Sequence, residues 1–455
     1  MTSRGWRKCL ILIALSAHLK LHADAPSQAE LQYLYSVLPL IQARELDEAE
    51  GKLLIGLKEF PRSAVLSNAL GMVYEQEKKT PDAIHAFEQA TEWLPNFTAA
   101  QLHLASLLAE TGACDRAGPL LLAVEKQSSE PGVLSAVGIG LAQCKDYTSA
   151  VPALERAHSL DPGAAATTFN LALAQFRQGD LGSALHTLDS LATVPDKGRP
   201  ETLFLRGRVL QAMGKPGAAA AMAEACRGNP VDDYCSDAAI ELIQEEQFVE
   251  AVNLLEDALT NLRPSVALLS TLGLAQFRLG RYRGAIDSYS KAIELDPESE
   301  APREGLGFLL YMTGDLSRAR SVVEPAAAKA NSDFYLPYLN ALILYRMGRP
   351  LWPESLSSLI NAVKRNPRFA PAFFLRGKIL MEDGDLNSAL RDFGSAASLD
   401  TTYALPYYKM AQIYLRQGRS EAAEKAQMQF FKLGSLREEE VLARQAQDQL
   451  LSRSR

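Results

Sequence analysis

The sequence predicts an all-α protein built as a tandem array of paired helices, and three regularities along its 455 residues support that fold class. In one unit after another, a small residue is followed twelve places later by an alanine. A glycine recurs between the two, and a proline closes most units. Two short amphipathic helices that cross closely need Gly or Ala where their backbones approach, so the pattern indicates two packed helices in each unit.

The small position marks where the first helix of a unit meets the second. It is filled by Gly71, Ala105, Gly138, Ala172, Gly207, Ala239, Gly273, Gly307, Gly377 and Ala411. Val37 opens the series, and Ala341 continues it, but Ala341 is paired with the more distant Ser355 because an insertion at 350–353 stretches that unit. We expect local irregularity at this insertion and in the slightly short unit at 201–231.

Turns between the paired helices are predicted at glycines, because a left-handed backbone costs glycine least. The turn glycines are Gly112, Gly179, Gly214, Gly280, Gly314, Gly348, Gly384 and Gly418. Four prolines are expected in the first turn of a first helix, where a missing N–H costs little. They are Pro302, Pro337, Pro371 and Pro406. Pro325 instead falls within a second helix, which it should bend.

Two units carry the clearest motif, at 266–299 and 64–97. The first holds Leu272, Gly273, Gln276, Gly280, Ala285, Tyr289, Ala292 and Pro297, and the second holds Leu70, Gly71, Tyr74, Ala83, Phe87, Ala90 and Pro95. Both resemble the tetratricopeptide repeat, which matches roughly twelve units of about 34 residues over 30–437. The resemblance implies a right-handed α-solenoid whose first helices line a concave groove that holds peptides or partner helices.

The N-terminal residues 1–25 have the layout of a secretory signal peptide. Arg4, Arg7 and Lys8 precede the apolar run 9–17, and a small-x-small site ends at Ala25. The apolar run is shorter than the ~20 residues that span a bilayer, which favours cleavage over an uncleaved anchor. We therefore expect an exported protein, periplasmic or secreted, with no membrane span after the signal segment.

At the other end, residues 438–455 are expected to form a capping helix and tail. Leu442, Ala446 and Leu450 are spaced by four in a polar segment, as on one face of a helix that covers the last repeat.

Composition and residue spacing argue against nucleic-acid binding and against catalysis. The chain has 47 Lys and Arg against 54 Asp and Glu, with no basic cluster for phosphate contacts. After the signal segment the histidines stand alone on their helices, without ligand spacing for a metal: His85, His103, His158 and His186. No phosphate-binding loop or nucleophile motif is found outside the repeats, so we expect no enzyme activity, no metal and no cofactor.

Four cysteines follow the signal segment, and three pairings of them exist in principle. Cys114 and Cys144 fall near the turns of neighbouring units, while Cys226 ends one second helix and Cys235 begins the next first helix. Neighbour pairing therefore predicts the bridges Cys114 to Cys144 and Cys226 to Cys235. The alternative is that all four are small buried apolar residues.

A binding surface is predicted on first helices in the C-terminal half of the array. Tyr335, Tyr338 and Tyr345 share one helix face, and Arg346 and Arg416 are expected at the groove edge. Comparable places in adjoining units hold Phe308, Tyr311, Phe374, Lys378 and Tyr408. Aromatic residues and Arg dominate many interfaces, although routine packing of the repeats also explains a ring before a turn glycine.

These observations predict an exported interaction scaffold that binds a protein or peptide in its groove, in an envelope or secretion-related assembly. A purely structural protein that self-associates through its terminal repeats is one alternative. Recognition of an envelope glycan by groove aromatics is another. Fold class does not choose among them.

Overall fold

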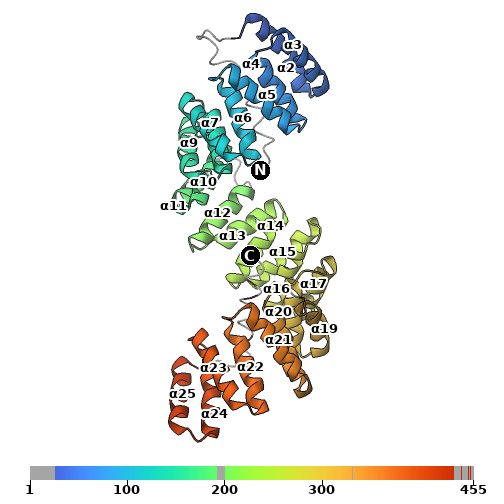
Figure 1. Ribbon diagram of the computed structural model, residues 1–455, viewed down its shortest axis with the longest axis vertical. Helices are drawn as coiled ribbons and strands as arrows, with labels where there is room; N and C mark the ends of the chain where they lie inside the picture. The colour runs from blue at the N-terminus through green and yellow to red at the C-terminus, as the bar shows by residue number, and fades with distance from the viewer. Residues whose placement is uncertain are drawn as a thin grey trace. The chain divides into compact units, whose positions relative to one another are not determined.

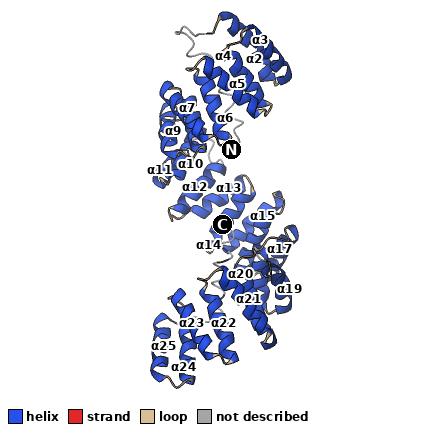
Figure 2. Ribbon diagram, viewed as in Figure 1, coloured by secondary structure: helices blue, strands red, loops and turns tan. Residues whose placement is uncertain are grey.

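The structure is a computed structural model that describes residues 26–191, 200–329 and 331–434, together with Leu442, Gln449 and Leu451. The expected signal peptide therefore lies outside the described residues, as does most of the expected capping helix. Every regular element in the described part of the chain is helical, and no strand occurs there (Figure 2). The all-α fold class is confirmed.

Twenty-four α-helices form twelve successive pairs in the described residues (Figure 1). The first six pairs are α2 (Gln28–Ala43) and α3 (Leu46–Glu59), α4 (Ala64–Gln76) and α5 (Thr80–Trp93), α6 (Thr98–Glu110) and α7 (Cys114–Gln127), α8 (Pro131–Gln143) and α9 (Tyr147–Leu160), α10 (Ala165–Gln178) and α11 (Leu181–Leu191), and α12 (Pro200–Ala212) and α13 (Ala218–Gly228).

The last six pairs are α14 (Asp232–Gln244) and α15 (Phe248–Asn261), α16 (Val266–Arg278) and α17 (Tyr282–Leu295), α18 (Ala301–Thr313) and α19 (Leu316–Ala327), α20 (Tyr335–Met347) and α21 (Trp352–Arg365), α22 (Ala370–Asp383) and α23 (Leu386–Leu399), and α24 (Leu405–Arg416) and α25 (Ser420–Leu433). The insertion predicted to disturb one unit forms a short 3₁₀ turn, η1 (Arg349–Leu351), between α20 and α21.

The chain folds as two compact units. The first runs to Gly198 and takes in Val209–Lys215, and the second holds Arg199–Arg208 and continues from Pro216. Within each unit, first helices of neighbouring pairs pack on one another as well as on their own second helices. Among the second helices that the structure describes, only α13 and α15 pack on each other as neighbouring first helices do. The row whose members lie closer together is the inner side of a curved stack, so first helices form the inner wall of each unit.

The small positions bring the paired helices together as predicted. A Cβ built on Gly273 would lie 2.9 Å from ring atoms of Tyr289 on the facing helix. A Cβ on Gly71 would lie 2.6 Å from the ring of Phe87, and one on Gly377 would lie 2.8 Å from that of Phe393. These three rings are buried and fill the space that each missing methyl group leaves.

The turn glycines also behave as predicted. All eight take positive φ, from 63° at Gly214 to 122° at Gly348. In four other pairs a residue with a side chain holds the left-handed turn, at Arg44, Lys78, Lys145 and Glu246, with φ between 60° and 63°. The left-handed turn is therefore a property of the repeat, and glycine is its commonest but not its required occupant.

The prolines lie where the sequence places them. Pro302, Pro371 and Pro406 are the second residues of their helices and Pro337 is the third of its helix, so all four occupy first turns. Pro325 lies inside α19.

Candidate partner-binding groove

All ten residues predicted to line a binding surface lie on four successive first helices of the second unit. α18 carries Phe308 and Tyr311, α20 carries Tyr335, Tyr338, Tyr345 and Arg346, α22 carries Phe374 and Lys378, and α24 carries Tyr408 and Arg416. Together they belong to the inner wall, which for the second unit comprises α14, α16, α18, α20, α22 and α24.

Five of these rings are buried between repeats, as the alternative of routine packing predicts for them. Their exposed fractions lie between 1% and 9%, for Phe308, Tyr311, Tyr335, Tyr338 and Phe374. The ring of Tyr338 meets that of Phe369 edge to face, with 4.9 Å between the centroids, and the ring of Phe308 lies 6.0 Å from that of Phe277. Adjacent first helices approach closely, so rings at these positions fill the space between repeats.

Burial changes the acid–base character of one of these rings. Tyr335 is fully enclosed, and loss of solvent raises the pKa of its phenol well above the ordinary value. The buried carboxylate of Glu304 opposes a second negative charge and adds to the rise in pKa. Tyr335 therefore stays neutral and serves packing.

The half-buried side chain of Tyr345 is the centre of a contact cluster across two repeats. Its hydroxyl donates to Oε1 of Glu382 at 2.6 Å, and Nζ of Lys378 lies 4.9 Å from the centroid of its ring. The indole of Trp352 stacks on the ring with 5.6 Å between the centroids, and its Nε1 donates to the Tyr345 carbonyl oxygen at 3.3 Å. We call Tyr345, Trp352, Lys378 and Glu382 the Tyr345 cluster.

Sequence reasoning missed Trp352 and Glu382. Trp352 belongs to the insertion at 350–353, for which the sequence predicts only local irregularity, and its position soon after Tyr345 is the signal that could have indicated the contact. Glu382 precedes the turn of the next repeat, and nothing in its spacing pointed to Tyr345.

Arg346 anchors α20 to the preceding first helix. Its Nη1 donates to the carbonyl oxygen of Tyr311 at 2.7 Å, and its guanidinium carbon lies 5.0 Å from the centroid of the Tyr311 ring. The side chain remains exposed. An Arg held in this way presents its charge at a fixed place on the wall.

The remaining predicted residues lie toward the end of the array. Phe374 packs on Phe393, while Tyr408 lies 5.3 Å from the ring of Phe430 and is 42% exposed. Arg416 is exposed in the last turn of α24. Among the predicted residues, Arg346 therefore contacts Tyr311, and Lys378 contacts Tyr345. Tyr408 and Arg416 contact neither pair and are exposed.

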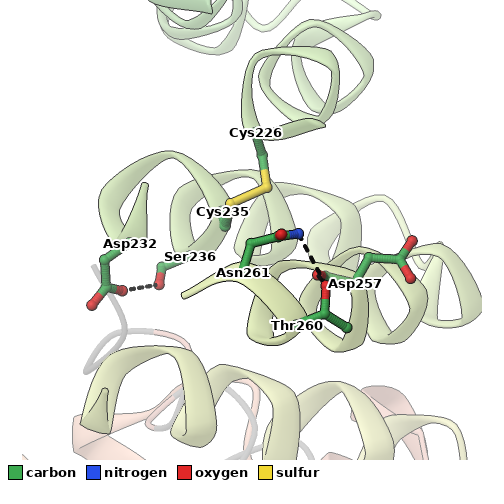
Figure 3. Close-up of a disulfide and its surroundings, with 7 residues drawn as sticks. All are labelled: Cys226, Asp232, Cys235, Ser236, Asp257, Thr260 and Asn261. Carbon is green, nitrogen blue, oxygen red and sulfur yellow. Dashed lines mark hydrogen bonds between the residues drawn. A yellow bond between two sulfur atoms is a disulfide. The ribbon is translucent and has the colours of Figure 1, made fainter. Parts of the chain in front are cut away.

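The four cysteines are bonded in the neighbour pairing that the sequence favours. Cys114 is joined to Cys144 with 5.4 Å between their Cα atoms, and Cys226 to Cys235 with 5.0 Å. Figure 3 shows Cys226 and Cys235 linking two successive helices, α13 and α14, near a hydrogen bond from Ser236 to Asp232. Oxidation of these cysteines in the protein's own compartment stays a prediction.

Within the described ranges, no group of three His, Cys, Asp or Glu side chains is arranged to hold a metal ion. Among the helices described, none combines the length and apolar character that crossing a bilayer demands.

Several solved structures resemble the chain in part, all at low identity. Yeast Tom70 is 14% identical, covers 92% of this chain and 99% of its own, and gives a TM-score of 0.39. MamA from Desulfovibrio magneticus RS-1 is 18% identical over 37% of this chain and 94% of its own, with a TM-score of 0.34. YrrB, described as a TPR protein with an unusual peptide-binding site, is 20% identical over 39% of this chain and 91% of its own, with a TM-score of 0.33.

No curated protein sequence matches the chain. Family models are decisive instead, and each describes a TPR or tetratricopeptide repeat. They match residues 68–131, 141–200, 200–225, 273–314, 338–403 and 405–433, which together make up more than half of the sequence. The chain belongs to the tetratricopeptide repeat family.

Proposed function

We propose that the chain is a non-enzymatic scaffold that binds a peptide or protein segment along the inner wall of its second unit. One observation carries the proposal. Tyr345, Lys378 and Tyr408 stand on three successive first helices, α20, α22 and α24, and each keeps part of its side chain accessible. Rings and cations repeated along a wall suit an extended or helical segment, because a few such anchors supply most of an interface's free energy.

The charged groups beside these anchors favour a polar partner with apolar side chains at intervals. Lys378 and Glu382 meet at the Tyr345 ring, and Arg346 stands next to it. Charges of both signs beside the anchors contribute more to the register of a bound segment than to its affinity.

We also propose that the protein works outside the cytoplasm, in an envelope or secretion-related assembly. Support comes from the basic, apolar and small-residue order of residues 1–25. Two bridges between neighbouring repeats agree with an oxidising compartment. N-terminal sequencing of the native protein tests this proposal: a chain that begins near Ala25 supports export, and a chain that retains Met1 in the cytoplasm contradicts it.

Peptides selected from a displayed library against the purified chain test the binding function. The affinity of a selected peptide should fall at least tenfold in the Tyr345→Ala, Tyr408→Ala double variant, because two ring anchors are removed. Tyr282→Ala is the matched control, since Tyr282 is an exposed ring on the second helix α17. Equal affinities for all three chains, with folding verified by circular dichroism, would remove this wall from consideration.

Self-association through the end of the array is a second candidate, favoured by one observation. Phe431 and Met428 on α25 are 75% and 60% exposed, an unusual load of apolar surface for the final helix of the repeats. Light scattering after size exclusion tests it. A dimer that becomes a monomer in Phe431→Glu would support this candidate, and a wild-type monomer at high concentration would reject it.

A further inference from the structure

Each first helix meets the second helix of the preceding repeat through one face, and two glycines locate that face. A Cβ built on Gly305 of α18 would collide with the ring of Tyr289 on α17. A Cβ on Gly140 of α8 would lie 3.0 Å from a methyl carbon of Leu121 on α7. Gly305 comes two residues before the small position of its helix, and Gly140 comes two residues after its own. Residues at these two places therefore face the preceding repeat.

On α2, the first helix that the structure describes, the same places are exposed and uncharged. Tyr35 and Pro39 occupy them, two residues before and two residues after Val37, and Gln32 lies one turn before Tyr35. The Tyr35 side chain is 58% exposed, and Gln32 and Pro39 are exposed as well. We call Gln32, Tyr35 and Pro39 the N-terminal face. The equivalent residues of α16 are all buried: Leu268, Thr271 and Ala275.

The second helix of the last repeat leaves a ring exposed at a place that inner repeats pack. Phe431 lies eight residues after Ala423 of α25, and its side chain is 75% exposed. At the same place of their own second helices, Ile293 packs on an apolar core cluster and Ala327 is only 6% exposed. No repeat follows α25 in the described residues, so nothing takes the part of the next first helix there.

The first helix of the last repeat is open in the same way. Tyr408 and Leu415 of α24 lie three residues before and four residues after its small position, and they are 42% and 56% exposed. On α22 the same two places hold Phe374 and Met381, which are 3% and 7% exposed. We call Tyr408, Leu415 and Phe431 the C-terminal face. It is the surface of an inner repeat without the helix that normally covers it.

The two leucines described beyond α25 pack on other repeats. Leu442 packs against an apolar cluster whose members come from α17 to α22, and Leu451 against one whose members come from α13 to α16. Neither cluster has a member on α24 or α25. These leucines therefore contribute their apolar surface to other repeats than the last.

Opposite net charges on the two terminal repeats favour contact between unlike ends. The first repeat, residues 28–59, carries six acidic and three basic side chains, whereas the last, residues 405–433, carries two acidic and five basic ones. Two copies that meet through unlike ends therefore attract each other, and two copies that meet through like ends repel each other. The charges flank two faces that are themselves uncharged, which leaves the centre of the contact free of buried charge.

We propose that the C-terminal face of one copy receives the N-terminal face of a second copy, as each inner repeat receives the next first helix. The inference rests on the self-association put forward above as the second candidate function, and it names the surface that α25 meets. Contact between two different faces is heterologous, so it repeats from copy to copy and builds a linear or closed multimer instead of a two-fold dimer.

Complementation between two variants of the full chain tests this arrangement. Tyr35→Glu places a charge on the N-terminal face and Phe431→Glu places one on the C-terminal face, and both side chains are exposed, so folding should persist. In light scattering after size exclusion, the wild-type mass should rise with concentration, and each variant alone should need at least tenfold more protein to associate. An equimolar mixture should form a dimer, because each variant keeps the face that the other has lost.

Tyr282→Glu is the matched control, because it places the same charge on an exposed ring of the second helix α17 and should associate as the wild type does. A mixture that stays monomeric would overturn the inference. Dimers of Tyr35→Glu alone would show contact between two C-terminal faces, which overturns the inference while self-association itself stands. A wild-type chain that is monomeric at every concentration would reject both.

A crosslinking experiment identifies the occupant of the C-terminal face directly. A full chain with photoreactive p-benzoylphenylalanine at position 431 is mixed with an isotope-labelled wild-type chain. Crosslinks to labelled peptides of residues 28–43 would support the inference. Crosslinks confined to the chain's own residues 435–455 would show that its C-terminal segment covers this face, and would overturn it.

Discussion

The ring of Tyr289 lies directly against the backbone of Gly273, so close that a methyl group on the glycine would be 2.9 Å from the ring. Ring and glycine belong to the two helices of one repeat, α17 and α16. The ring of Tyr289 therefore occupies the space that a side chain at position 273 would need. The same relationship holds for Gly377 and Phe393.

Replacing Gly273 by Ala should destabilise the second unit by about 1–3 kcal/mol, because the new methyl group forces apart two helices that have no other space for the ring. Gly394→Ala is the control. A Cβ at Gly394 meets nothing within 4 Å on its helix α23, so this change should stabilise by about 0.5–1 kcal/mol. Urea unfolding followed by circular dichroism measures both, and equal midpoints for the two variants would contradict the close-packing account.

Tyr289→Phe should leave stability unchanged or raise it by up to about 1 kcal/mol. The hydroxyl is buried, and no hydrogen-bond partner for it lies among the described residues, so its removal sheds a desolvation cost without losing a bond. Tyr33→Phe makes the comparison, because the Tyr33 hydroxyl donates to the Lys52 carbonyl oxygen at 2.7 Å. Thermal unfolding of both variants should show a loss only for Tyr33→Phe, and a clear loss for Tyr289→Phe would point to an undescribed bond.

Lys78→Gly should stabilise the first unit by a few tenths to about 1 kcal/mol, because Lys78 holds the turn at φ 63° and glycine adopts that conformation without steric cost. The reverse change, Gly280→Lys, should destabilise the second unit by about 1 kcal/mol at φ 79°. Hydrogen exchange on the adjoining helices reports each effect locally. If hydrogen exchange showed both variants stabilised, or both destabilised, the left-handed backbone of the turn would not be the cause of the change in stability.

Reduction should open the two bridges in a fixed order. Cys226 and Cys235 are buried, whereas Cys114 and Cys144 are half-buried, and thiol exchange requires access to a sulfur atom. Alkylation and mass spectrometry during treatment with dithiothreitol should therefore find Cys114 and Cys144 modified first. Loss of each bridge should cost about 2–4 kcal/mol, more for the bridge of longer sequence separation, 30 against 9. Four free thiols in the native protein would reject the bridges altogether.

Much of the fold could be predicted because the same steric constraints apply at the same positions of each repeat. Small residues, turn glycines and first-turn prolines each follow from one steric rule, and the structure places them accordingly. The turns at Lys78 and Glu246 carried no such signal, since their left-handed backbone is imposed by the neighbouring helices. Local preference predicts where a turn is easy, and packing decides where it occurs.

The candidate site could be predicted in position but not in exposure. Spacing along α20 correctly put Tyr335 and Tyr338 on a first helix, but their burial depends on how closely the next repeat approaches. Contacts between Tyr345 and Glu382 cross a repeat boundary, and a periodic pattern within one unit does not reveal them. The regular spacing of Leu442, Ala446 and Leu450 predicts a helix on the last repeat, whereas Leu442, the one of the three that the structure describes, packs against a cluster from α17 to α22.

The bridge between Cys114 and Cys144 also bears on how the chain responds to tension. A repeat array pulled from its ends gives way one unit at a time, and each unit that opens releases its full contour length. With the bond formed, the 30-residue loop that it closes cannot be extended. About 100 Å of contour length, at ~3.4 Å per residue, is therefore not released when the unit opens. A protein stretched between two attachment points would therefore keep this junction of its repeats at a fixed length while the junctions without a bridge extended.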